Sequence, residues 1–96
     1  MTQANAFIES QDYIQAQGIL QSILKEYPSH VEAKEALQKA NEAIHQKARQ
    51  DYTEAIVEEN VGRIDQAVKK FRDIIQRTPA TDEYHKKAKN KLSKYE

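Results

Sequence analysis

The strongest constraint on the fold is a pattern of residue types that occurs twice, with corresponding positions 51 residues apart. Each copy has a turn, an apolar residue, an alanine, two further large apolar residues and then a proline. The corresponding pairs are Tyr13 and Ile64, Ala16 and Ala67, Leu20 and Phe71, Ile23 and Ile74, and Pro28 and Pro79. Residues spaced by three and four lie on one face of a helix, and proline ends the helix. The pattern predicts a helical repeat, a class that binds other molecules more often than it catalyses reactions.

The composition is that of a folded helical chain. At 96 residues the chain has room for one domain. Its hydrophobic fraction of 39% and charged fraction of 31% exclude a disordered chain, and two Gly and two Pro leave few turns. The absence of cysteine removes disulfides and thiolate chemistry and favours a cytoplasmic location. No apolar run approaches the ~18 residues of a membrane span, so we expect no membrane insertion.

Helix start and stop signals divide the chain into five segments. We predict helices over residues 2–10, 12–27, 29–60, 63–77 and 81–96. Asp12 and Thr81 are placed to cap helix N-termini, and Ser29 with Glu32 forms a capping-box pattern. Gly62 suits the end of the long segment, because glycine readily adopts the left-handed conformation common after a helix. The prediction is an all-α fold of antiparallel helix-turn-helix units with one long central helix.

On these residues the chain resembles the tetratricopeptide repeat (TPR) family. The resemblance lies in the second helices of two repeats: Tyr13, Ala16, Leu20, Ile23 and Pro28, and then Gly62, Ile64, Ala67, Phe71, Ile74 and Pro79. The usual spacing in that family is about 34 residues, so a spacing of 51 implies an elongated first helix in the second unit. Glu54 and Glu58 also depart from the family pattern, because they occupy positions that are normally apolar.

The resemblance implies a single TPR-like helical domain over residues 1–96. It would comprise a truncated repeat at 1–28, a repeat with an elongated first helix at 29–80, and a closing helix at 81–96. Because Met1 lies only a few residues before the first apolar pair, we expect the chain to be part of a longer protein.

For function, the resemblance implies binding of a protein or peptide in a groove lined by the first helix of each repeat. Mapped onto this chain, the partner-binding positions are Asn5, Ile8, Glu9, Arg49, Tyr52, Thr53, Ile56, Glu59, Asn60, Lys86, Lys87, Asn90 and Lys94. Lys86 and Asn90 also resemble the opening pair of the clamp with which one subfamily binds the C-terminal carboxylates of chaperones. No further repeat follows to complete that clamp, so the resemblance predicts binding residues and leaves the partner open.

No combination of residues predicts catalysis, and we expect no enzyme activity, no cofactor and no metal site. The histidines, which are His30, His45 and His85, lack a second ligand at the spacing that a metal needs on one helix. We therefore interpret them as surface side chains. The three glutamates in segment 54–59 have no adjacent His or Lys in the sequence, so we interpret them as a solvated or partner-facing strip.

Charge is unevenly distributed although the net charge is zero. Residues 1–60 carry 5 basic and 10 acidic side chains, whereas residues 61–96 carry 10 basic and 5 acidic ones. Five of the basic side chains are lysines between residues 86 and 94. We interpret these mainly as a solvated helix face, with contact to an acidic protein as the first alternative and contact to nucleic acid as the second. Nucleic acid is the weaker alternative, because the segment lacks arginine and its two tyrosines suit packing.

The leading hypothesis is a scaffolding or regulatory module that docks an acidic amphipathic helix or extended segment of another protein. The docking surface would be formed by the central and last helices. The alternative is self-association, through the N-terminal repeat or by exchange of helices. A lesser alternative is nucleic-acid contact through the basic last helix, which predicts a steep loss of affinity with added salt.

Overall fold

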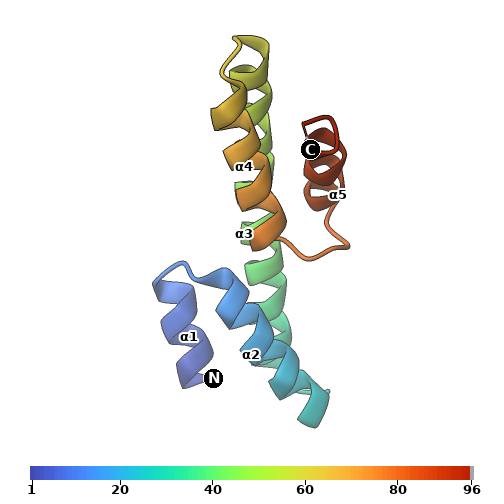
Figure 1. Cartoon of the computed structure of the whole chain (residues 1–96). Helices are drawn as coiled ribbons and strands as arrows, with labels where there is room; N and C mark the ends of the chain where they lie inside the picture. Colours follow the sequence, from blue (N-terminus) through green and yellow to red (C-terminus); the bar gives the residue numbers. More distant parts are fainter. Residues whose placement is uncertain (96) are drawn as a thin grey trace. The chain divides into compact units, whose positions relative to one another are not determined.

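The computed structural model describes residues 1–95, and over this range the only regular elements are α-helices. The five helices are α1 (Thr2–Glu9), α2 (Tyr13–Glu26), α3 (Val31–Asn60), α4 (Ile64–Arg77) and α5 (Glu83–Leu92) (Figure 1). The prediction of an all-α fold with five helices and one long central helix is confirmed. The contacts divide the chain into two compact units, which we call unit 1 (Met1–Ile44) and unit 2 (from His45 onward).

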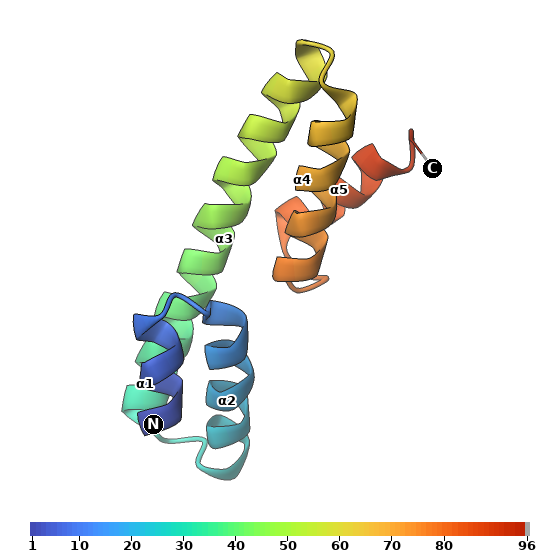
Figure 2. The ribbon, with the colours of Figure 1, turned by 60° about the vertical axis from the view of Figure 1, so that its left-hand side comes forward.

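Unit 1 consists of α1, α2 and the first part of α3, which lie side by side (Figure 2). The centre of its core is formed by Ala4, Ala16, Leu20 and Ala33, each with no exposed surface. Three of these four residues are alanines, so the helix backbones can approach closely while Leu20 fills the space between them. Larger, partly buried side chains such as Phe7 and Ile23 surround this centre. The small and large positions predicted for residues 16 and 20 are therefore core positions.

Unit 2 consists of the remainder of α3 together with α4 and α5. Its core contains Ala48, Ala55, Ala67, Phe71, Ile74, Ala88 and Leu92. Phe71 has no exposed surface and Ile74 is 1% exposed. Full burial of an aromatic or large aliphatic side chain stabilises a fold by about 1.5–3 kcal/mol. These two α4 residues are therefore the main apolar anchors of unit 2.

The turns that lead into α2 and α4 have the same backbone geometry, 51 residues apart. Gln11 has a φ of 62° and Gly62 a φ of 86°, which places both residues in the left-handed region. In the first turn the Asp12 amide donates to the Phe7 carbonyl at 2.8 Å. In the second turn the amide and carbonyl 51 positions later make the equivalent hydrogen bond, also at 2.8 Å. Gly62 thus ends α3 as predicted, whereas Gln11 adopts the same conformation with a side chain that disfavours it.

The helix starts agree with the sequence at one position and correct it at two. The Asp12 carboxylate accepts from the backbone amide of Gln15 at 3.4 Å, so its predicted capping role is confirmed. The prediction that Ser29 caps α3 is wrong, because the turn after Pro28 extends the chain to His30, whose Nδ1 accepts from the Ala33 amide at 3.1 Å.

The second correction concerns α5. The cap is Asp82 and not Thr81, because the Asp82 carboxylate accepts from the Tyr84 amide at 2.8 Å. The turn in which the Asp82 amide bonds to the Pro79 carbonyl, at 2.9 Å, moves the first helical residue past Thr81. Among residues 1–95, no helix combines the length and the apolar character needed to cross a bilayer.

Candidate interaction surface

Several predicted binding residues of unit 2 lie where α3 faces α5. One of them is Tyr52. Its half-buried ring packs against Phe71, with 5.8 Å between ring centres, and against Tyr84, with 5.6 Å. The Lys87 ammonium lies 5.9 Å from the centre of the Tyr52 ring and 5.3 Å from that of Tyr84. A lysine at such distances is attracted by the negative faces of the rings. We call the surface formed by Tyr52, Glu59, Lys87 and Lys91 the α3–α5 face.

Glu59 occupies the end of the α3–α5 face nearest the C-terminus of α3. Its carboxylate accepts from the Lys91 ammonium at 2.9 Å and from the Tyr95 hydroxyl. The Tyr95 hydrogen bond and then the Lys91 hydrogen bond hold the pKa of Glu59 below its ordinary value of 4.5. The same hydrogen bond to Glu59 raises the pKa of Lys91, and the Tyr95 pKa is raised for the same reason. Glu59 and Lys91 are therefore both charged at neutral pH and joined across two helices.

Lys87 makes its ion pair within α5. Its ammonium lies 2.9 Å from the carboxylate of Glu83, one helical turn earlier. The hydrogen bond that Lys87 donates to Glu83 raises the pKa of Lys87 and lowers that of Glu83. Both side chains are about half exposed, at 46% for Lys87 and 56% for Glu83. Exposed pairs of this kind contribute little to stability, so Lys87 can exchange Glu83 for another carboxylate at small cost.

The predicted binding residues fall into three groups in the structure. Tyr52 and Lys87 lie together on the α3–α5 face, and Glu59 belongs to it through its contact with Lys91. Ile8 and Ile56 are half-buried and pack against the cores of unit 1 and unit 2 respectively. The exposed members are Asn5, Glu9, Arg49, Thr53, Asn60, Lys86, Asn90 and Lys94. The exposed members therefore present polar and charged side chains to solvent, whereas the two isoleucines contribute mainly to packing.

Two members of this site were not among the predicted binding residues. Lys91 follows Lys87 by four residues, so both lie on one side of α5, and this spacing was visible in the sequence. Tyr95 lies beyond the end of α5 at Leu92, and its contact with Glu59 depends on the path of the chain after that helix. No sequence signal indicates that path.

The acidic strip of residues 54–59 and the histidines have partners that the sequence did not indicate. The Lys70 ammonium of α4 lies 3.4 Å from Glu54 and 3.5 Å from Glu58, and Glu59 binds Lys91. The expectation that these glutamates lack a lysine partner is therefore wrong, although Glu54 is largely exposed, with 62% of its side chain in solvent. α4 and α5, which follow in the sequence, supply the lysines.

The three histidines likewise make structural contacts. One is the His30 cap of α3 described above. His45 Nδ1 lies 3.0 Å from the Asp82 carboxylate, and its ring centre is 5.1 Å from that of Tyr84. His85 Nδ1 lies 3.1 Å from both the hydroxyl and the carbonyl oxygen of Thr78. All three histidines remain partly exposed, as expected, and the contacts add partners that the sequence did not indicate.

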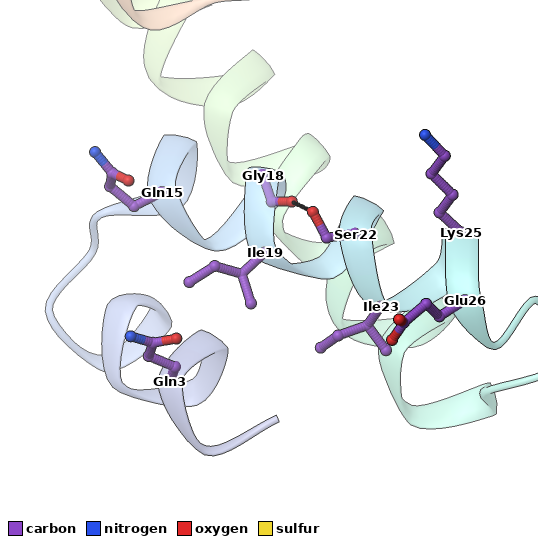
Figure 3. A pocket seen from close by; sticks show the side chains of 8 residues that line it. All are labelled: Gln3, Gln15, Gly18, Ile19, Ser22, Ile23, Lys25 and Glu26. Atoms are coloured by element: carbon purple, nitrogen blue, oxygen red, sulfur yellow. Dashed lines mark hydrogen bonds between the residues drawn. The ribbon is translucent and has the colours of Figure 1, made fainter.

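A second surface feature lies in unit 1, where a shallow groove of about 890 Å³ runs between α1 and α2. The lining residues are Gln3, Gln15, Gly18, Ile19, Ser22, Ile23, Lys25 and Glu26 (Figure 3). Ile19 and Ile23 extend from α2 on the side of α1, and Gln3 extends from α1. A Cβ added at Gly18 would meet no atom within 4 Å outside its own helix. The groove is thus part apolar and open at Gly18.

Within the described residues, no group of three or more His, Cys, Asp or Glu side chains is arranged to hold a metal ion. Compared with protein-family models, curated proteins and solved structures, the chain gives no significant match.

Proposed function

We propose that the chain is a non-catalytic interaction module of the TPR type, acting in the cytoplasm as a scaffold or regulator. It binds an acidic helix or extended segment of a partner protein on the α3–α5 face. The observation that carries this proposal is the position of the Lys87 ammonium over the rings of Tyr52 and Tyr84, beside Lys91 on the next turn of α5. This arrangement offers positive charge and apolar ring surface to the same ligand.

The charge of α5 supports an acidic partner. The helix and the residues directly after it carry Lys86, Lys87, Lys89, Lys91 and Lys94. Two of these lysines have ion-pair partners among the described residues, namely Lys87 with Glu83 and Lys91 with Glu59. An excess of positive charge therefore remains on and beside the face. Such an excess attracts acidic segments and speeds their association, and the attraction weakens with salt.

The binding test uses a fluorescein-labelled peptide of alternating Glu and Leu residues, titrated with the protein at low salt. The main variant is Lys87→Gln, which removes the charge beside Tyr52. The matched control is Lys89→Gln, because Lys89 is an exposed lysine of the same helix that makes none of the contacts of the α3–α5 face. We expect several-fold weaker binding for Lys87→Gln and near-unchanged binding for Lys89→Gln. No binding to the wild type, or equal losses for the two variants, would contradict the proposal.

Self-association through unit 1 is a second candidate function. The observation that favours it is the open groove between α1 and α2, with half-buried Ile19 and Ile23 in its lining. A substitution of Ile19→Asp would place a charge in that groove. If the groove joins two copies, sedimentation of the wild type shows a dimer fraction that increases with protein concentration, and the variant stays monomeric. A wild type that is monomeric at every concentration excludes this candidate.

Nucleic-acid binding through α5 is the weakest candidate. Phosphates would use the same lysines as an acidic peptide, namely Lys87 and Lys91, but α5 and the residues around it contain no arginine. The Lys87 ammonium already lies over the rings of Tyr52 and Tyr84, where a stacked base would have to lie. A gel-shift experiment with single- and double-stranded nucleic acid at low salt tests this candidate, and no retardation removes it.

A further inference from the structure

We infer that Glu59 acts as an internal competitor on the α3–α5 face, holding Lys91 and Tyr95 until an acidic partner displaces it. This inference concerns the regulation of the proposed binding surface and therefore rests on the proposed function. It follows from the difference between two ion pairs of α5, Glu59–Lys91 and Glu83–Lys87.

Both carboxylate oxygens of Glu59 accept hydrogen bonds. One carboxylate oxygen accepts from the Lys91 ammonium at 2.9 Å, and the other accepts from the Tyr95 hydroxyl. The Glu59 side chain is 13% exposed and that of Lys91 is 24% exposed. Both oxygens are thus occupied by donors that belong to α5 and the residues after it. A carboxylate from another protein needs these same donors.

Lys87 contrasts with Lys91. Its partner Glu83 lies one turn away on the same helix, and both side chains are about half in solvent. Water and counter-ions reach that pair and screen it. Lys87 is therefore available to a partner from the start, whereas the charge of Lys91 is offset until Glu59 leaves.

Competition by Glu59 lowers the apparent affinity of the face for an acidic partner. When the binding-competent form is only a fraction of the population, the apparent dissociation constant rises in inverse proportion to that fraction. A carboxylate fixed beside Lys91 competes at a high effective concentration, because it is part of the same chain. Removing the Glu59 charge should therefore tighten binding of an acidic peptide, on the order of tenfold if the competing form is about nine-tenths populated.

The competition needs a control for net charge. Any acid-to-amide change makes the protein more positive and strengthens its attraction for an acidic peptide. Glu83→Gln changes the net charge by the same amount as Glu59→Gln and removes the partner of the other lysine. Because the Glu83–Lys87 pair is exposed, we expect its loss to tighten binding by no more than about twofold. The difference between the two variants measures the competition.

The experiment measures dissociation constants of the labelled Glu–Leu peptide for wild type, Glu59→Gln, Glu83→Gln and Tyr95→Phe. Circular dichroism establishes that each variant keeps its helical content. Tyr95→Phe removes one hydrogen bond to Glu59 and leaves both charges in place, so it should tighten binding by a few-fold. The expected order of affinity is Glu59→Gln, then Tyr95→Phe, then Glu83→Gln, with the wild type weakest.

The outcomes separate the two proposals. If wild type and Glu59→Gln bind the peptide equally while Lys87→Gln weakens binding, the surface is correct and the competition is refuted. If neither wild type nor Glu59→Gln binds, the proposed function itself fails and the competition fails with it. If Glu59→Gln does not fold, Tyr95→Phe decides, and an affinity equal to that of wild type overturns the inference.

Discussion

The side chains of His45 and Asp82 join the α3 portion of unit 2 to the start of α5, with 3.0 Å between His45 Nδ1 and the carboxylate. The other Asp82 oxygen accepts from the Tyr84 amide at 2.8 Å and caps α5. One carboxylate, only 9% exposed, therefore both starts a helix and attaches it to its neighbour. The position of α5, and with it the α3–α5 face, depends on this residue.

We expect Asp82→Ala to destabilise the protein by more than an ordinary cap substitution, which costs about 0.5–2 kcal/mol. The added loss comes from the contact with His45, whose imidazole keeps no partner for Nδ1. Urea unfolding followed by circular dichroism measures the effect. Asp82→Asn is the matched control, because asparagine keeps a capping oxygen and removes the charge. Equal stability of Asp82→Ala and wild type would contradict the double role.

Stability should fall with acid through Glu59, whose folded-state pKa is below its ordinary value of 4.5. The hydrogen bonds from Tyr95 and Lys91 favour the carboxylate form. Its contribution is therefore fully present above the unfolded pKa, and it is lost as the pH falls through the folded pKa. Unfolding free energies measured from about pH 7 down to about pH 3 should decrease for wild type and less steeply for Glu59→Gln. Parallel curves for the two proteins would refute this assignment.

Corresponding core positions of the two units should respond similarly to truncation. Leu20 and Phe71 are 51 residues apart and have no exposed surface. We expect Phe71→Ala to cost about 3–5 kcal/mol and Leu20→Ala about 2–5 kcal/mol. Either loss is a large part of a total stability of about 5–15 kcal/mol. Urea unfolding measures both, with Val61→Ala, at a 64% exposed site, as a control expected within about 0.5 kcal/mol. A mild effect at Phe71 would contradict its central place in the core.

The two glycines should respond to alanine with opposite signs. Gly18 lies inside α2, where an added Cβ meets no atom within 4 Å outside its own helix, so Gly18→Ala should stabilise by about 0.5–1 kcal/mol. Gly62 has a φ of 86°, so Gly62→Ala should destabilise by roughly 1–2 kcal/mol. Melting temperatures of the two variants check the signs, and the same sign for both would contradict this account.

Most of the fold could be predicted from local patterns. The helix of residues 13–26 follows from apolar side chains at spacings of three and four and from Pro28 after its end. Gly62 marks the end of α3, because a left-handed residue is needed there. The capping residues of α3 and α5 were displaced by one position from the predicted Ser29 and Thr81. Which residue caps a helix depends on where the preceding turn ends. The types of the neighbouring residues do not determine that position.

The candidate site was only partly predictable. Tyr52 and Lys87 were among the predicted binding residues and lie close together. Glu59 was also predicted, but its partners Lys91 and Tyr95 were not. Periodicity indicates that Ala88 and Leu92 of α5 face the core, and both are buried. It does not indicate which charged side chains beside that stripe meet residues of α3. The partners of Glu54 and Glu58 depend in the same way on the rotation of α4.

The helices, their approximate ends and the alternation of Ala with large apolar side chains in the core follow from the order of the residues alone. These properties follow from backbone sterics and from the period of the helix, which act over a few residues. Which charged groups meet depends instead on how the helices pack: Lys91 meets Glu59, Lys70 meets Glu54, and His45 meets Asp82. In each pair the two residues belong to different helices, or, for Asp82, to the position just before a helix. Long charged side chains have many possible partners, and packing of the apolar faces selects among them.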